Sequence, residues 1–178
     1  MEMTWLLCSY RLPRDPTRLR LAIWRRMKRV GAVVLHDSLW VLPADAKTRE
    51  DFDWLAEEIE ERSGSVLLWD AQSLPSGQDA ELIRRFQADA EARYATIRDA
   101  AAQLTKLGRR HRLTARSLEQ ALQRLRVLER AFRLERRRDY FSAPGQREAR
   151  EIIEAAMNEI RSRKELGAAR GKTHAVGN

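Results

Sequence analysis

The stretch Leu12–Pro43, LPRDPTRLRLAIWRRMKRVGAVVLHDSLWVLP, decides how the first part of this chain folds. Asp15 is a favourable N-cap residue, and Pro16 is a favourable first residue of a helix. From there, apolar residues recur at spacings of four, four and three, at Leu19, Ile23, Met27 and Val30. This spacing predicts a helix with one buried face.

The second part of the stretch predicts a pair of short strands. Gly31 has the usual position of a residue that ends a helix. Two apolar runs follow, Ala32–Leu35 and Ser38–Leu42, and His36-Asp37 lies between them as a turn. Residues 4–10, TWLLCSY, precede the helix and predict another strand.

Working outward, the chain repeats the helix and strand signals once more. Thr48, with Asp51 three residues later, predicts the start of a second helix. Its core face is expected at Phe52, Leu55, Ala56 and Ile59. Gly64 ends it, and Ser65–Trp69 predicts a fourth strand. The resulting order βαββαβ predicts an α+β fold with a ferredoxin-like domain over residues 1–73. One sheet face is left for a partner, a ligand or the later helices to cover.

Beyond the linker Leu74–Gly77 the strand signals stop, and helical spacing takes over. Apolar residues at intervals of three and four predict helices of roughly 30 residues from Ile83, of Thr114–Arg138, and from Ser142 onward. We therefore expect an antiparallel helical hairpin or three-helix bundle over residues 78–166. Residues 167–178 lack apolar periodicity and are predicted to be disordered.

Charge is distributed unevenly along a chain whose net charge is +8. Residues 1–70 hold 11 basic and 12 acidic residues, net −1, which leaves 23 basic and 14 acidic residues, net +9, for residues 71–178. Such a basic excess, mostly arginine, favours a polyanionic partner, and we expect nucleic acid. One cysteine excludes an internal disulfide, and no apolar run is long enough for a membrane helix or signal peptide. We expect a cytoplasmic protein without membrane contact.

The first helix carries a candidate phosphate-binding row of arginines, Arg18, Arg25 and Arg29. Residues 11–31 hold eight basic residues and one acidic residue. The alternative is that these arginines pair with the second helix, because residues 43–62 hold eight acidic and three basic residues. The sequence leaves both interpretations open.

A second basic segment, residues 104–138, holds twelve basic and three acidic residues. Favourable interaction with a helix dipole explains some of the basic residues near a helix end, but not so many. We therefore expect contact with DNA or another oxyanion here, at Arg109, Arg110, Arg112, Arg136, Arg137 and Arg138. No motif for base-specific contacts is present.

Catalytic and metal-binding patterns are absent from the sequence. Cys8 is expected to be a buried small residue, and His36-Asp37 a turn. No phosphate loop, zinc motif or nucleophile elbow occurs. We expect no enzyme activity, no cofactor and no metal site. Five tryptophans lie in the first 70 residues; most are expected in the core, and Trp54 on the side opposite the core face.

Several segments together resemble the N-terminal domain family of the chromate-resistance protein ChrB. They are WLLCSYRLP, IWRRMKRVGAV, SLWVLP and DYFSAPG, in this order, and the resemblance covers most of residues 4–160. Wider relatives include the middle domain of phenylacetate-pathway repressors and small CRISPR-associated nucleases. Those nucleases carry an aspartate at the end of the first strand, where this chain has Ser9-Tyr10, so the resemblance does not imply nuclease activity.

The resemblance implies a chromate-responsive transcriptional regulator of a chromate-resistance operon, with promoter DNA as partner. Because chromate is a tetrahedral dianion, the arginines are candidates to bind it as well. The alternative is that chromate is sensed by a second domain and that this chain binds DNA without sensing. Full-length members usually continue into a second domain, which this sequence does not include. The alternative is a non-catalytic, dimeric protein-interaction module with a basic surface. Under both hypotheses we expect a homodimer.

Overall fold

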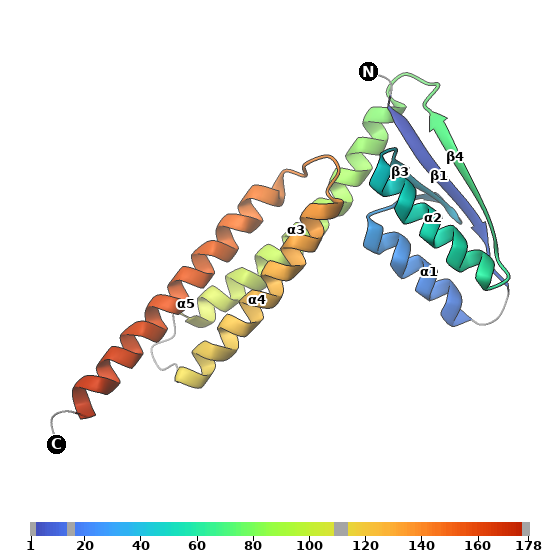
Figure 1. Ribbon diagram of the computed structural model, residues 1–178. Coiled ribbons are helices and arrows are strands. Elements are labelled where there is room, and N and C mark those ends of the chain that lie inside the picture. The colour runs from blue at the N-terminus through green and yellow to red at the C-terminus, as the bar shows by residue number, and fades with distance from the viewer. Residues whose placement is uncertain (1–2, 14–16, 109–113, 176–178) are drawn as a thin grey trace. The chain divides into compact units, whose positions relative to one another are not determined.

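The computed structural model describes residues 3–13, 17–108 and 114–175. The elements are β1 (Thr4–Arg11), α1 (Thr17–Val30), β2 (Val33–His36), β3 (Leu39–Pro43), α2 (Ala46–Glu61), β4 (Ser65–Gln72), α3 (Gln78–Gly108), α4 (Ala115–Arg138) and α5 (Gly145–Ala175). The predicted α+β class is confirmed (Figure 1). The chain forms two compact units, one of Met1–Asp89 with Arg138–Phe141, the other of Ala90–Arg137 with Ser142–Asn178.

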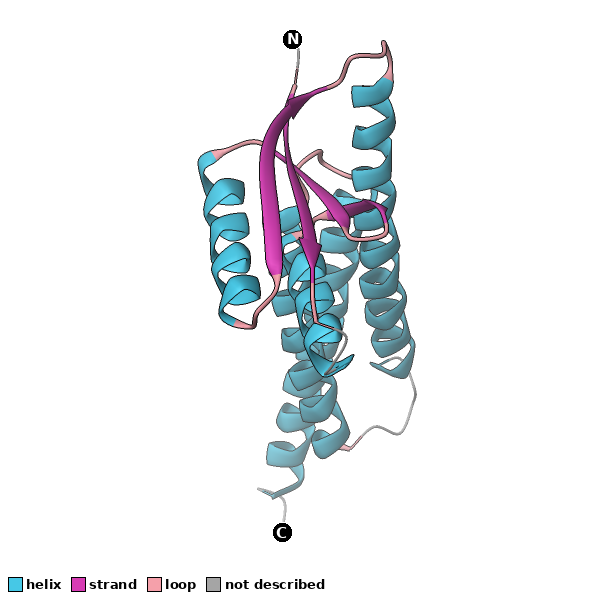
Figure 2. Cartoon of the chain, turned by 90° about the vertical axis from the view of Figure 1, so that its right-hand side faces the viewer, coloured by secondary structure: helices cyan, strands magenta, loops and turns pink. Residues whose placement is uncertain are grey.

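The four strands of the first unit form one antiparallel sheet in the order β2-β3-β1-β4. Figure 2 shows the twist of these strands, in magenta. The turn between β2 and β3 is at Asp37-Ser38, one residue later than the predicted His36-Asp37, because His36 belongs to β2. Asp37 adopts a positive φ of 45° there, which aspartate tolerates better than most residues. The predicted helix start at Asp15 and Pro16 lies outside the described residues.

Helices α1 and α2 cover one face of the sheet (Figure 1). Of the predicted core positions of α1, Leu19, Ile23 and Met27 are buried, and Val30 is half-buried against the same core. They join Cys8 of β1 and Phe52 of α2 in one apolar core. Burial of such a helix face provides most of the stability that a helix has inside a protein.

Helix α2 begins earlier than the sequence predicts. Its N-cap is Asp45, whose side chain accepts a hydrogen bond from the Thr48 backbone N–H at 2.8 Å. The Thr48 hydroxyl in turn accepts one from the Asp45 N–H at 2.9 Å and donates to the carbonyl of Pro43. Thr48 is therefore the third residue of the helix, because this reciprocal pairing satisfies two backbone donors that a start at Thr48 would leave open.

The second face of the sheet is covered in part by the start of α3. The Trp5 ring stacks on Phe86 at a centroid distance of 5.9 Å, and Phe141 packs against both rings. The Trp5 Nε1 donates a hydrogen bond to Asp79 at 2.8 Å. Residues of β4 on the same face, Leu67 and Trp69, stay exposed.

The second unit contains the remaining part of α3 together with α4 and α5, whose apolar residues form a second core. Inside it, Arg93 of α3 pairs with the buried Glu135 of α4 at 2.6 Å. Arg98 of α3 bridges Glu91 and Glu148 at 2.9 and 3.0 Å. Three helices thus share one core. Of the two alternatives that the sequence predicted, a helical hairpin and a three-helix bundle, the structure has the three-helix arrangement.

Helix α5 continues to Ala175, through most of the segment that the sequence predicts to be disordered. Residues 167–175 include three alanines, one arginine and one lysine, which favour helix even without an apolar face, whereas their two glycines disfavour it. Within the described residues, none of the helices has the length and apolar character of a membrane span.

Candidate nucleic-acid interface

The arginine row of α1 lies on the surface of the first unit. Arg18, Arg25 and Arg29 are all exposed, and their spacings of seven and four residues place them within about 40° of one another around the helix. No ion pair or hydrogen bond joins them to the described part of the chain. The row extends over about 16 Å, which matches roughly five base pairs of B-DNA along its axis.

Pairing between α1 and the acidic α2, the alternative for this row, involves a different arginine. Arg26 lies 2.7 Å from Glu58, which also lies 3.8 Å from Arg62. Lys28 pairs instead with Asp89, at 2.9 Å, and lies over the Trp40 ring. The basic residues of α1 therefore have two different environments. Arg26 and Lys28 form ion pairs within the first unit, whereas the row of three arginines forms none with the described residues and could contact a partner.

Helix α4 presents a second row of arginines in the other unit. Arg126, Arg130 and Arg133 follow at spacings of four and three, are exposed, and have no ion-pair partner among residues 3–13, 17–108 and 114–166. The buried residues of the helix, including Leu118, Leu125 and Phe132, lie roughly 100° around the helix from this row. The predicted site does not include this row, although its helical spacing is visible in the sequence.

The other predicted site residues have different surroundings. Arg136 and Arg137 are exposed near the end of α4 and extend its basic surface. Arg109, Arg110 and Arg112 lie outside the described residues. The predicted site residues therefore do not form one continuous group in the described structure.

Arg138 has a role in the fold of the first unit. Its guanidinium donates a hydrogen bond to the carbonyl of Lys28 at 2.9 Å, and the Tyr140 hydroxyl donates one to the carbonyl of Val30 at 2.6 Å. The last turn of a helix has carbonyls without partners inside the helix. Arg138 thus serves as a cap for α1. We therefore assign its guanidinium a structural role and no longer include it among the candidate phosphate contacts.

The close approach at this cap depends on a glycine. Gly31 has a φ of +84°, and a Cβ added there would lie 2.8 Å from the Cβ of Arg138 and 3.2 Å from the Tyr140 ring. Any other residue would be strained in its backbone and would collide with the capping side chains. The predicted helix stop at Gly31 is therefore confirmed, with a tertiary reason in addition to the local one.

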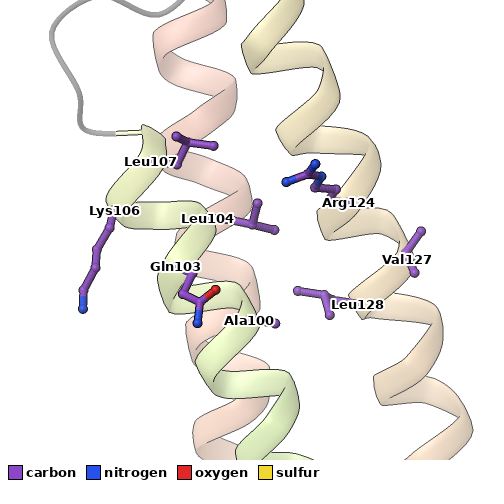
Figure 3. A pocket seen from close by; sticks show the side chains of 8 residues that line it. All are labelled: Ala100, Gln103, Leu104, Lys106, Leu107, Arg124, Val127 and Leu128. Carbon is purple, nitrogen blue, oxygen red and sulfur yellow. The ribbon is translucent and has the colours of Figure 1, made fainter.

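A cavity of about 650 Å³ lies between α3 and α4 in the second unit (Figure 3). Leu104 and Leu128 point toward each other across it, whereas the Lys106 side chain is directed away. A tetrahedral oxyanion requires several converging hydrogen-bond donors. The mainly apolar walls of this cavity do not provide them, so we do not regard it as an oxyanion site.

Cysteine, acidic and tryptophan side chains complete the description of the site. Burial raises the pKa of the Cys8 thiol to about 12, so it stays protonated and unreactive at neutral pH. In the described part of the chain, no group of three His, Cys, Asp or Glu side chains could hold a metal ion. Of the tryptophans, Trp5 and Trp40 are buried, whereas Trp24, Trp54 and Trp69 are 47%, 64% and 44% exposed.

The expectation that most tryptophans lie in the core is therefore wrong. Trp24 is on the solvent side of α1, and Trp69 is on a part of the sheet that α3 does not cover. The expectation for Trp54 is confirmed, because it points away from the core face of α2.

Comparison with known proteins identifies the family. The family model described as the N-terminal part of protein ChrB matches residues 20–167. Protein ChrB of Cupriavidus metallidurans is 28% identical over 120 residues, which are 62% of this chain and 37% of that protein. No solved structure matches the chain. Because the family model covers most of the sequence, the chain belongs to the family of ChrB N-terminal domains.

Proposed function

We propose that this chain is a DNA-binding part of a transcriptional regulator associated with chromate resistance. The observation that carries the proposal is the presence of two exposed arginine rows that form no ion pair within the described residues, Arg18, Arg25 and Arg29 on α1, and Arg126, Arg130 and Arg133 on α4. Family membership supports it, since the resemblance associates ChrB with chromate-resistance operons. The proposal involves no catalytic step, and such a role belongs in the cytoplasm.

We also propose that the first unit is a ferredoxin-like module. The succession β1, α1, β2, β3, α2, β4 and the sheet order β2-β3-β1-β4 support this assignment. In this module the arginine row would lie on the outer surface of α1, because Leu19, Ile23 and Met27 on the other side of the helix are buried in the core.

The test is DNA binding as a function of salt concentration. Fluorescence anisotropy with a duplex from the region upstream of the gene would give the affinity of the wild type and of the triple variant Arg18→Gln/Arg25→Gln/Arg29→Gln. If each arginine contacts one phosphate, the slope of log K against log salt should fall by about 2.7. Absence of binding by the wild type at low salt would contradict the proposal.

A matched control has the same change in net charge at other exposed arginines. Arg84, Arg147 and Arg150 pair with acidic residues of their own helices, Glu81, Glu151 and Glu154. Their triple replacement by glutamine should leave the salt slope near the wild-type value. An equal loss in both triple variants would mean that total charge, rather than the row on α1, drives binding.

Chromate is the effector that the proposal implies. It is a tetrahedral dianion, and exposed guanidinium groups could bind it and DNA in competition. We expect chromate to weaken DNA binding more strongly than sulfate, which has the same charge and a similar shape. Equal effects of the two anions would show that this chain does not sense chromate by itself.

A second candidate function, an interaction module for an acidic protein, is favoured by the exposed aromatic side chain of Trp54. Aromatic residues with arginine are enriched at protein interfaces. A chain that does not bind DNA, and whose complex with an acidic protein is lost after Arg18→Gln/Arg25→Gln/Arg29→Gln and after Trp54→Lys, would support this alternative.

A further inference from the structure

The two edges of the sheet differ in how they are protected. β2, at one edge, has only four residues, a register shift between Val34 and His36, and a hydrogen bond from Arg85 to the Val34 carbonyl. β4, at the other edge, has eight residues in unbroken register with β1 (Figure 1). Short length, irregular register and covering side chains are means by which proteins prevent edge pairing.

β4 lacks these protective features. It contains no proline, lysine or arginine, and its one charged residue, Asp70, is already paired with Arg49 at 2.5 Å. In an antiparallel ladder, every second residue of an edge strand directs its N–H and C=O groups outward. Within the described residues, β4 therefore offers a row of backbone donors and acceptors that no other strand pairs with, and it has no charged side chain of its own that would repel a second strand.

The exposed side chains of β4 add apolar area beside that edge. Leu67 and Trp69 lie opposite Ser9 and Leu7 of β1, on the face where Phe86 covers Trp5. They are 60% and 44% exposed. Exposed apolar side chains beside an unprotected strand edge indicate an interaction surface.

We propose that β4 pairs with β4 of a second copy of this chain, in antiparallel orientation, about a two-fold axis at Leu68. The axis is perpendicular to the sheet, so each copy keeps its faces and a continuous eight-stranded sheet results. In this register Leu67 of each copy lies opposite Trp69 of the other, which gives two apolar cross-strand contacts. Seven of the eight residues of β4, residues 65–71, are opposite one another in this register, and their backbone donors and acceptors are complementary under this rotation.

A second copy fits this edge better than a charged partner would. The pairing brings no unpaired like charges together, although the chain as a whole has a net charge of +8. The seven paired residues extend over about 24 Å, and pairing along one edge buries much less than the roughly 1,600 Å² of a standard interface. We therefore expect a weak, concentration-dependent dimer.

Sedimentation velocity over a range of protein concentrations tests the proposal. Wild type should shift from monomer to dimer, and Leu67→Lys/Trp69→Lys should weaken the dimer at least roughly tenfold. Trp54→Lys is the matched control, because Trp54 is even more exposed but lies on α2. A wild type that stays monomeric at all concentrations, or a dimer that Trp54→Lys breaks while the β4 variant does not, would overturn the proposal.

Cysteine cross-linking tests the register and does not depend on folding of the lysine variant. Cys8 must first be replaced by alanine, because it lies opposite Leu68 on β1. In that background Leu68→Cys should form a disulfide between two copies, since directly opposed Cα atoms are about 4.5 to 5.5 Å apart. Leu67→Cys alone should not, as its counterpart is diagonal at roughly 7 to 8 Å. Equal cross-linking of both variants would exclude this register. DNA binding does not enter either test, so failure of the proposed function leaves this inference intact.

Discussion

β1 and β4 are neighbouring strands of equal length, TWLLCSYR and SVLLWDAQ, yet their environments are opposite. β1 lies inside the sheet and buries Trp5, Leu6, Cys8 and Tyr10. β4 lies at the edge, and none of its side chains is buried. Similar composition therefore leads to a core strand in one case and to an exposed surface in the other, because position in the sheet decides which strand is covered. The following predictions test this contrast.

The largest expected difference is in thiol reactivity. Burial raises the pKa of Cys8 from 9.0 to about 12, which lowers its thiolate fraction at pH 8 about a thousandfold. In a Cys8→Ala background, Leu67→Cys on β4 should react at the rate of a free thiol. Stopped-flow labelling with an aromatic disulfide measures both rates. If Cys8 were labelled as fast as the thiol introduced by Leu67→Cys, the burial of Cys8 within β1 would be contradicted.

The next largest effect concerns stability. Trp5→Ala removes the ring that stacks on Phe86 and contacts Phe141. We expect it to lower the free energy of unfolding by about 3–5 kcal/mol, as for other large aromatic residues in cores. Urea denaturation followed by far-ultraviolet circular dichroism measures the change. A loss below about 1 kcal/mol would be typical of a surface site and would contradict the core position of Trp5.

A smaller effect depends on pH. Hydrogen bonds from Ser73 and then from Trp5 lower the pKa of Asp79 below its ordinary value of 3.8. A carboxylate with a lowered pKa stabilises the fold above its unfolded pKa, and this contribution is lost as the pH falls through the folded value. Asp79→Asn should therefore melt at a lower temperature than wild type at pH 6, and the difference should shrink below about pH 4. Ser73→Ala, which keeps the bond to Trp5, should be intermediate. If the difference in melting temperature between wild type and Asp79→Asn grew as the pH fell, the proposed stabilisation by the Asp79 carboxylate would be contradicted.

The smallest effect is expected on β4. Trp69→Ala, measured in dilute solution where the chain is monomeric, should change the free energy of unfolding by no more than about 0.5 kcal/mol. The same denaturation experiment as for Trp5→Ala applies. A loss similar to that of Trp5→Ala would mean that β4 is covered in the monomer, and would remove the contrast between the two strands.

Much of the fold could be predicted because local patterns determine it. The spacing of Leu19, Ile23 and Met27 identifies the buried side of α1, and Gly31 identifies its end. Burial of the tryptophans could not be predicted in this way. Trp5 is buried because Phe86, 81 positions along the chain, packs on it, whereas Trp69 has no such neighbour. That difference is tertiary and leaves no periodic signal near either residue.

The candidate site shows the same limit. The helical spacing of Arg18, Arg25 and Arg29 predicts an exposed row, which is found. The sequence could not distinguish Arg26, which pairs with Glu58, from its neighbours, because the choice depends on how α2 lies beside α1. It also could not assign Arg138 to the end of α1, since the carbonyl that it binds is 110 residues away.

The cap of α1 by Arg138 and Tyr140 has a consequence for the order of folding during synthesis. A nascent chain that has emerged to Gln72 holds all four strands, but it lacks Phe86 and both capping side chains. N-terminal segments emerge from the ribosome first. The sheet is therefore complete before the Val30 carbonyl has its hydrogen-bond donor and before one apolar face is fully covered, because both require residues that follow α4. A fragment that ends at residue 73 would keep that incomplete state permanently, so the shortest stable piece of this unit is expected to extend through Phe141.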